Sequence, residues 1–330
     1  MVEEQHSVLH QLHRAIITSP TPLPDTLFTF CVLDTPTNNS WTFSRSNDPA
    51  WEAGGNFWVM PHFSFWSWPL PFIGTMDQAL SKIEKIEKEM SWAEKIDKAV
   101  WRGTAWFNSV ANRDLRPSLV LKSKGKEWAD VETLAWHNNA EDATNAIAIH
   151  DFCKYKYIIY TEGITYSGRL PFHQACASVI ISPPIGYLLH TTHLVRPVFS
   201  TSFLPQPESP ASSTVYDWWK SLWPHPYEVS EANIVFVKPD WSDLEETISY
   251  LRSHPEIASG IAQRQRDVFK RYLSPAAEVC YWRALIKGWS EVARPNYEHG
   301  SVGTWNVGGV DVEEGMRFET YSLLGKLKPK

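Results

Sequence analysis

Apolar residues recur at helical spacing in several parts of the chain. Between Met76 and Val100 they return every three or four positions, with Lys and Glu between them, which predicts an amphipathic helix. Residues 1–18 show a shorter pattern of the same kind, which ends at a Ser-Pro-Thr-Pro run because proline stops a helix. Further helices are expected over 111–114, 170–175, 244–253, 256–272 and 276–289.

Short apolar runs between these helices have the length and composition of buried strands. They occupy residues 27–33, 119–121, 155–160, 178–181 and 233–237. The first run ends just before Asp34, so we expect this carboxylate at the carboxyl end of a strand. Strands alternate with helices in both halves of the chain, which divide near residue 150. This alternation predicts an α/β fold of two domains with a cleft between them.

Tryptophan is concentrated in an irregular segment, residues 41–72. The chain has 17 Trp. Five of them lie in this segment: Trp41, Trp51, Trp58, Trp66 and Trp68. Gly54-Gly55 and several prolines argue against a regular element here, so we expect an ordered loop region held by its own rings. These rings either fill a core or line a groove.

Length and charge exclude several classes of protein. The 330 residues carry a net charge of -6, from 31 basic and 37 acidic side chains spread along the chain, which gives no field that attracts nucleic acid. No apolar run approaches the roughly 18 to 20 residues that a membrane span needs, and the first residues lack the pattern of a signal peptide. A soluble protein without a nucleic-acid partner is expected.

The common catalytic motifs are absent from the sequence. It has no Gly-rich dinucleotide or P-loop motif, no His-Glu-x-x-His, no Gly-x-Ser-x-Gly and no Asp-x-Asp that would hold a metal ion against a diphosphate. Any bound diphosphate must therefore be held by arginines. His190 and His193 are types of residue that bind metal ions, but no acidic residue lies near them in the sequence, so no metal site is expected there.

Cysteine usage is light and does not fix the compartment. The four cysteines form no Cys-x-x-Cys and no array at zinc spacing, so a zinc site is not expected. One pair could be bridged in an oxidising compartment.

Seven segments, in a fixed order along the chain, carry a resemblance to a known family. They are Asp34-Thr35-Pro36, residues 60–66 (MPHFSFW), 101–104 (WRGT), 112–114 (NRD), 153–180, Asp243-Leu244 and 272–282. In this order and spacing they resemble glycosyltransferase family 90, which contains capsule-associated xylosyltransferases and protein O-glucosyltransferases. The resemblance covers residues 27 to about 290.

The resemblance implies a fold and a reaction. The fold is GT-B-like, with two Rossmann-like domains facing a cleft: residues 1–150 on the acceptor side, 151–292 binding the nucleotide-sugar, and 293–330 as a tail. The reaction is inverting transfer of glucose or xylose from UDP-glucose or UDP-xylose to a hydroxyl of a glycan or protein acceptor. It requires neither a metal ion nor another cofactor, and it takes place in the secretory pathway, in the ER or Golgi.

The resemblance also assigns roles to individual residues. Asp34 matches the general base, whereas from the residue alone it is an Asp that caps a turn before Pro36. Arg113 and Arg169 match the arginines that hold the diphosphate, for which the planar guanidinium is suited, and their alternative is a structural salt bridge. Three further donor-side residues are Gly103, Thr104 and Ser167, with ordinary turn residues as the alternative.

The same resemblance places Phe65 and Trp66 near the acceptor cleft and pairs Cys153 with Cys176 in a disulfide, against the alternative of a reduced buried pair. Gly168 and Ala105 depart from the family pattern, so the donor sugar is not carried over. Two other functions stay open at this point. One is a nucleotide-sugar-binding protein that has lost catalysis, and the other is a glycoside hydrolase that uses Asp34 with a second carboxylate such as Asp114.

Overall fold

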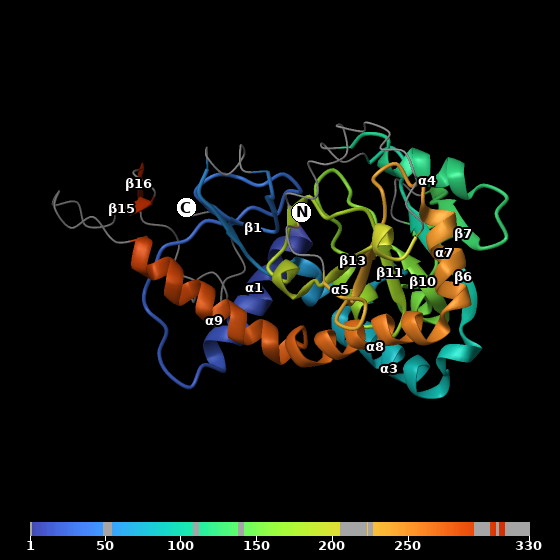
Figure 1. The fold of residues 1–330 in the computed structure, drawn as a ribbon. Helices are drawn as coiled ribbons and strands as arrows, with labels where there is room; N and C mark the ends of the chain where they lie inside the picture. Colours follow the sequence, from blue (N-terminus) through green and yellow to red (C-terminus); the bar gives the residue numbers. More distant parts are fainter. Residues whose placement is uncertain are drawn as a thin grey trace.

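The centre of the molecule is a six-stranded, fully parallel β-sheet (Figure 1). The computed structural model describes residues 2–48, 55–107, 112–137, 142–204, 223, 227–293, 304–307 and 310–313. The strand order across the sheet is β13-β14-β11-β10-β6-β7. These strands are β6 (Ile96–Gly103), β7 (Ala129–Thr133), β10 (Tyr155–Ile159), β11 (Val179–Ser182), β13 (Pro197–Phe199) and β14 (Ile234–Phe236).

Both faces of the sheet are covered. In β10 the neighbours Tyr157 and Ile158 are buried in different core clusters, because successive side chains of a strand point to opposite faces. Val179 and Ile180 of β11 divide in the same way. Continuous apolar strands of this kind are typical of parallel sheets with helices on both sides.

Helices account for most of the remaining regular structure. They are α1 (Val2–Ile17), α3 (Met76–Glu89), α4 (Leu115–Ser123), α5 (Leu170–Gln174), α7 (Leu244–Ser253), α8 (Pro255–Tyr272) and α9 (Pro275–Val292). The predictions for α1, α5, α7, α8 and α9 are confirmed to within a few residues. The side chain of Ser274 caps α9 by accepting a hydrogen bond from the Ala277 backbone N–H, and Pro275 occupies the first helical position.

The N-terminal segment packs with α9 as a second layer beside the sheet (Figure 1). Its short pairs are β1 (Ser40–Thr42) with β3 (Phe57–Val59), β2 (Arg45–Ser46) with β12 (Tyr187–Leu188), and β4 (Ser67–Trp68) with β5 (Gly74–Thr75). Trp41 is fully buried, 4.4 Å from the stacked ring of Phe28 and 5.9 Å from the rings of Trp282 and Trp289. Trp41 therefore fills a core; Trp51 lies outside the described residues.

Two short antiparallel pairs complete the described secondary structure. They are β8 (Trp136–His137) with β9 (Asp142–Ala143), and β15 (Thr304–Val307) with β16 (Val310–Glu313). None of the described helices is both long and apolar enough to cross a membrane.

Four predicted elements differ from the structure. The helix expected over 111–114 is not formed in its described part, residues 112–114, which lie in a turn, and α4 begins only at Leu115. The helix expected over 76–100 ends at Glu89, a Ser91/Glu94 capping box forms the next turn, and the chain then enters β6. Residues 27–33 form no strand, only one isolated bridge between Phe30 and Trp41. Residues 119–121 lie in α4, because a three-residue apolar run fits a helix as well as a strand.

The sheet takes strands from both sides of residue 150. β6 and β7 precede this residue, and β10 pairs directly with β6. The division expected at residue 150 therefore falls within the sheet rather than between two sheets. The α/β class is confirmed, while the GT-B arrangement of two Rossmann-like domains stays a prediction.

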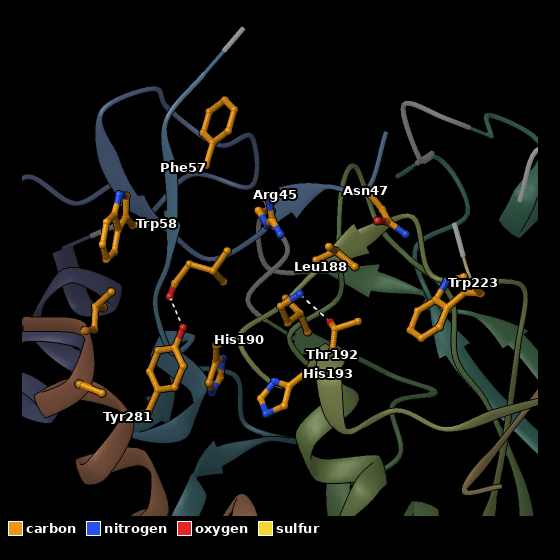
Figure 2. A pocket seen from close by; sticks show the side chains of 14 residues that line it. Arg45, Asn47, Phe57, Trp58, Leu188, His190, Thr192, His193, Trp223 and Tyr281 are labelled. Carbon is orange, nitrogen blue, oxygen red and sulfur yellow. Dashed lines mark hydrogen bonds between the residues drawn. The ribbon is translucent and has the colours of Figure 1, made fainter. Parts of the chain in front are cut away.

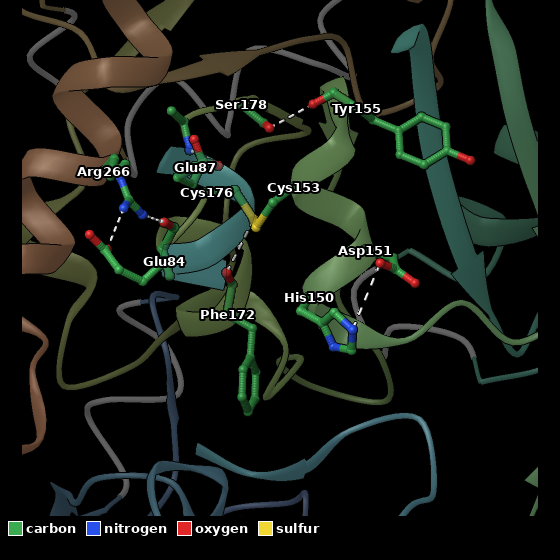
Figure 3. The surroundings of a disulfide bond; sticks show 12 residues. Glu84, Glu87, His150, Asp151, Cys153, Tyr155, Phe172, Cys176, Ser178 and Arg266 are labelled. Atoms are coloured by element: carbon green, nitrogen blue, oxygen red, sulfur yellow. Dashed lines mark hydrogen bonds and ion pairs between the residues drawn. A yellow bond between two sulfur atoms is a disulfide. The ribbon is translucent and has the colours of Figure 1, made fainter. Parts of the chain in front are cut away.

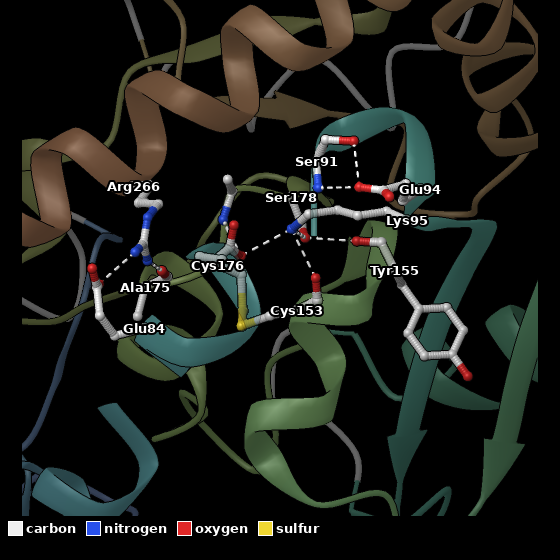
Figure 4. A network of polar contacts seen from close by, with 12 residues as sticks. Glu84, Ser91, Glu94, Lys95, Cys153, Tyr155, Ala175, Cys176, Ser178 and Arg266 are labelled. Carbon is white, nitrogen blue, oxygen red and sulfur yellow. Dashed lines mark hydrogen bonds and ion pairs between the residues drawn. A yellow bond between two sulfur atoms is a disulfide. The ribbon is translucent and has the colours of Figure 1, made fainter. Parts of the chain in front are cut away.

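A disulfide joins Cys153 to Cys176 at the end of the sheet where β10 begins (Figure 3). Beside it lies the buried Lys95, whose Nζ donates to Glu87 Oε1 at 2.9 Å and to the Cys153 carbonyl at 2.7 Å (Figure 4). The Lys95 charge is thus compensated by Glu87 within the core. This network fixes the amino-terminal edge of the sheet, opposite the carboxyl ends of the strands.

Candidate functional site

The carboxyl ends of β6 and β10 form the point where the winding of the sheet reverses. From β6 the chain crosses to β7 on one side, and it then returns to β10 on the other side of β6. In open parallel sheets, such a reversal leaves a crevice at the carboxyl edge in which ligands bind. The predicted residues Gly103 and Thr104 lie there, at the end of β6.

A buried guanidinium, that of Arg116, joins these two strand ends. Arg116 is 5% exposed and comes from the first turn of α4. Its Nη1 donates to the Thr104 carbonyl at 2.9 Å, and its Nε donates to Thr161 Oγ1 at 3.2 Å and to the Glu162 carbonyl at 2.9 Å. Burial lowers the pKa of Arg116 to about 9, and the nearby charge of Arg169 adds to this shift.

Arg169 brings a second positive charge to the same strand ends. It lies in the turn before α5, and its Nη1 donates to the carbonyl of Arg102 in β6. The residue is partly exposed, yet the protein around its guanidinium lowers its pKa to about 10, chiefly by desolvation. Within the described residues, the hydrogen bonds of Arg116 and Arg169 go to carbonyl and hydroxyl oxygens, so no contacting carboxylate compensates either charge. Two such cations side by side favour an anionic ligand.

Asp34 lies near Arg116. Its carbonyl accepts a 2.6 Å hydrogen bond from Thr165 Oγ1, which ties the extended segment around residue 34 to the turn after β10. Asp34 is an exposed residue, but desolvation of its carboxyl group raises its pKa; the Glu4 carboxylate adds to this rise, and Arg116 opposes it. A carboxylate of raised pKa that stays open to solvent is suited to accept a proton.

Two hydrogen bonds between Ser167 and Tyr160 hold the turn between β10 and α5. The Ser167 backbone N–H donates to the Tyr160 hydroxyl at 3.1 Å, and the Tyr160 hydroxyl donates to the Ser167 carbonyl at 3.4 Å. At Gly103, an added Cβ would lie 2.4 Å from the ring of Trp101, so the end of β6 requires glycine. Ser167 and Gly103 thus shape the backbone of the site.

Three other predicted site residues, Arg113, Phe65 and Trp66, differ in their exposure. Arg113 is exposed in the turn that precedes α4. Phe65 is 2% exposed in a core cluster, 5.2 Å from the ring of His190, so it does not line an open cleft. Trp66 is partly exposed and packs on α1, stacked 5.1 Å from His10 with Arg14 over its ring.

Sequence reasoning did not select Arg116. A helix over 115–123 places Arg116 on the face of Leu119 and Val120, three and four residues later, and this periodicity would have indicated a guanidinium buried with apolar neighbours. The strand expected over 119–121 concealed it.

The described residues contain one group with metal-ligand spacing, and it is not a metal site. It consists of Glu87 with Cys153 and Cys176, whose sulfurs form the disulfide. His190, which lacks an acidic neighbour in the sequence, pairs in space with the buried Glu278, 3.0 Å away.

Comparison with known proteins identifies the family. The family model "Glycosyl transferase family 90" matches residues 5–199, which is more than half of the chain and contains Asp34, Arg116 and Arg169. The chain belongs to glycosyltransferase family 90. The resemblance to this family is thereby confirmed; two of the seven segments that carry it, Asp243-Leu244 and residues 272–282, lie beyond the matched residues.

The curated relatives that match the chain are named O-glucosyltransferases. The chain is 25% identical to O-glucosyltransferase rumi of Drosophila melanogaster over 227 residues, 65% of this chain and 45% of the relative. It is 22% identical to protein O-glucosyltransferase 1 of Homo sapiens over 247 residues, 71% of this chain and 53% of the relative. The chain thus spans about half the length of these relatives.

Proposed function

We propose that this member of glycosyltransferase family 90 transfers glucose or xylose from a UDP-sugar to a hydroxyl group of a glycan or protein, with inversion at the anomeric carbon. The observation that carries the proposal is the pair Arg116 and Arg169, two guanidiniums at the reversal point of the sheet that have no hydrogen bond to a carboxylate within the described residues, with Asp34 near Arg116. A cationic pair suits a diphosphate, and a carboxylate of raised pKa suits an acceptor hydroxyl.

In the proposed reaction Asp34 takes the proton of the acceptor hydroxyl. The acceptor oxygen forms a bond to the anomeric carbon from the face opposite the diphosphate, while the bond from that carbon to the phosphate oxygen breaks and its electron pair leaves with UDP. Arg116 and Arg169 bind the negative charge that grows on the leaving diphosphate. Because fixed guanidiniums supply this charge, we propose that no metal ion or other cofactor is required.

The disulfide bears on where the protein works. Cys153 and Cys176 are joined, and disulfides persist in oxidising compartments. We therefore propose that the protein resides in the secretory pathway.

The donor site is tested by titrating the purified chain with UDP in EDTA. Wild type is expected to bind UDP. Arg169→Ala is expected to lose at least tenfold in affinity, because it removes one of the two guanidiniums proposed to bind the diphosphate. Arg116→Lys keeps the charge but loses the hydrogen bonds to Thr161 and Glu162, so we expect a loss there too. Arg113→Ala is the matched comparison: exposed Arg113 matches the family's diphosphate arginine, and a larger loss there than at Arg116 would move the diphosphate away from Arg116.

Catalysis is tested separately with Asp34→Asn. This variant is expected to bind UDP like wild type and to lose at least a hundredfold in transfer from UDP-glucose or UDP-xylose, because the amide does not accept the proton. Unchanged turnover would exclude Asp34 as the base, and a folded wild type that fails to bind UDP would overturn the whole proposal.

A further inference from the structure

A cavity of about 650 Å³ opens between β3, the segment after β12, and α9 (Figure 2). Its volume lies in the range of small-molecule sites. Four of the residues that line it carry large aromatic side chains: Phe57, Trp58, Trp223 and Tyr281. None of the residues that line it is Asp34, Arg116 or Arg169, so the cavity is separate from the proposed donor site.

The aromatic walls are held in place by contacts behind them. The Tyr281 hydroxyl donates to the Val59 carbonyl at 2.7 Å, and Trp223 Nε1 donates to the Ile185 carbonyl at 3.0 Å. The ring of Trp58 rests edge-on against Trp289, with centroids 5.4 Å apart. Trp58 and Tyr281 stand on one side of the cavity and Trp223 on the other (Figure 2). The cavity thus has fixed rings on two opposite sides.

Polar groups of defined orientation complete the lining. His190 is nine-tenths buried, and its Nε2 lies 3.0 Å from Glu278, which fixes the imidazole that faces the cavity between Tyr281 and His193. Arg45 and Asn47 line the cavity near β2. No carboxylate is among the lining residues of this cavity.

This combination suits a sugar ring. A pyranose has an apolar C–H face, which packs on aromatic rings, and an edge of hydroxyls, which planar amide, imidazole and guanidinium groups bind in pairs.

The cavity adjoins the proposed catalytic site through one residue. The Glu162 carbonyl accepts from Arg116, while its Oε1 accepts from the backbone N–H groups of Gly186 and Tyr187 at 2.9 and 2.8 Å. The next residue, Leu188, lines the cavity, and the Asn47 backbone N–H donates to the Gly186 carbonyl. Glu162 thus contacts the proposed donor site through its carbonyl and the segment that lines the cavity through its carboxyl group.

We propose that this cavity is an acceptor subsite that binds a neutral pyranose unit of a glycan, adjacent to the unit that receives the transferred sugar. The inference rests on the proposed function and narrows its acceptor from a glycan or protein to a glycan chain. It assigns recognition to Trp58, Trp223 and Tyr281 and orientation to Arg45 and Asn47.

The test uses a blocking variant. Ala284 is exposed on α9 and lines the cavity, so Ala284→Trp fills it without removing a core contact. Lys287→Trp, one turn later on the exposed side of α9 and outside the lining, is the matched control. Saturation-transfer NMR and titration are run with the methyl pyranosides of glucose, mannose, galactose and xylose, and UDP is titrated in parallel.

Wild type and Lys287→Trp are expected to bind at least one pyranoside, and Ala284→Trp to bind it at least tenfold more weakly while binding UDP normally. Arg169→Ala should lose UDP and keep the pyranoside, which separates the two proposals. The proposal is overturned if wild type binds none of the four sugars or if Ala284→Trp binds them like wild type. Pyranoside binding by a wild type that does not bind UDP would overturn the acceptor role and the transferase proposal together.

Discussion

At the residue scale, the turn that carries Arg169 depends on the contact of His62 with Gly168. A Cβ added at Gly168 would lie 2.3 Å from His62 Cε1, closer than side chains approach one another. Ser64 connects the same two segments, since its Oγ lies 2.7 Å from His62 Nδ1 and donates to the Gly168 carbonyl at 3.2 Å. Burial keeps the pKa of His62 well below its usual range, so the ring is neutral. The pair fixes how far the Ser167–Arg169 turn stands from the N-terminal layer.

Gly168→Ala is therefore expected to destabilise the chain and weaken UDP binding in the presence of His62, and to have much less effect in a His62→Ala background. We expect a coupling of about 1 kcal/mol or more in a double-mutant cycle, because the clash exists only when both side chains are present. Urea unfolding and UDP titration of the four proteins measure it. Gly260→Ala in α8 is the control, because the atom nearest to its added Cβ is Arg264 Nη1 at 3.1 Å, which is no clash of the kind at Gly168. Additive effects at Gly168 and His62 would contradict the contact.

The sequence predicted individual residues where a family pattern or a backbone requirement identified them. Asp34 and Arg169 were both selected, and the structure places each of them near Arg116. Arg116 was missed and Phe65 was expected at the cleft, because the burial of a side chain depends on the packing of elements distant in sequence. Gly168 was noted as a departure from the family, but the ring of His62 that fills its space becomes visible only in the structure.

At the scale of elements, a buried carboxylate holds β12 against the end of β10. Glu162 follows β10, and its side chain accepts from the backbone N–H groups of Gly186 and Tyr187. Burial raises the pKa of Glu162 to about 8, although the two hydrogen bonds oppose the shift. Since β12 also pairs with β2, this contact links the sheet to the N-terminal layer.

The raised pKa makes stability fall as the pH rises. Between the ordinary pKa of a glutamate and about 8, the folded chain binds a proton that the unfolded chain does not, so unfolding becomes easier by up to about 1.4 kcal/mol per pH unit. Glu162→Gln stays neutral and keeps an oxygen to accept both N–H groups. We expect its melting temperature to rise relative to wild type from pH 5 to pH 8.

Thermal melts of both proteins over this pH range measure the difference. Glu246→Gln, on the exposed side of α7, is the control and should follow wild type. Parallel curves for wild type and Glu162→Gln would show that Glu162 is ionised in the folded chain throughout.

Elements with a long amphipathic pattern could be predicted from the sequence, and short apolar runs could not. Helices α7 and α8 were expected to within one residue and α9 to within three, because each has many apolar positions at helical spacing. The boundary between α3 and β6 was missed, since Ile96 and Val100 fit a helix four residues apart as well as a strand. The 27–33 segment has strand composition, yet it has only the single bridge at Phe30.

At the scale of the whole molecule, the two edges of the central sheet have different tasks. The carboxyl edge carries the guanidiniums of Arg116 and Arg169, whose desolvation lowers their pKa values and costs stability, and to which we assign the binding of the donor diphosphate as a proposal. The amino edge is closed by the Lys95–Glu87 pair and the disulfide of Cys153 with Cys176 (Figures 3 and 4). The disulfide and the Lys95–Glu87 pair thus lie away from the proposed site.

Loss of the disulfide should therefore affect stability more than binding. Cys153→Ser with Cys176→Ser removes a cross-link between positions 23 residues apart, which stabilises the fold by about 3 kcal/mol if it acts mainly on the unfolded chain. We expect the free energy of unfolding in urea to drop by about this amount, while UDP affinity in the folded fraction stays within twofold of wild type, because the cross-link lies at the opposite edge of the sheet. Cys280→Ser, an exposed unpaired cysteine, is the control and should change neither quantity. A loss of UDP affinity as large as that of Arg169→Ala, in a double variant that still unfolds cooperatively, would show instead that the amino edge positions the site.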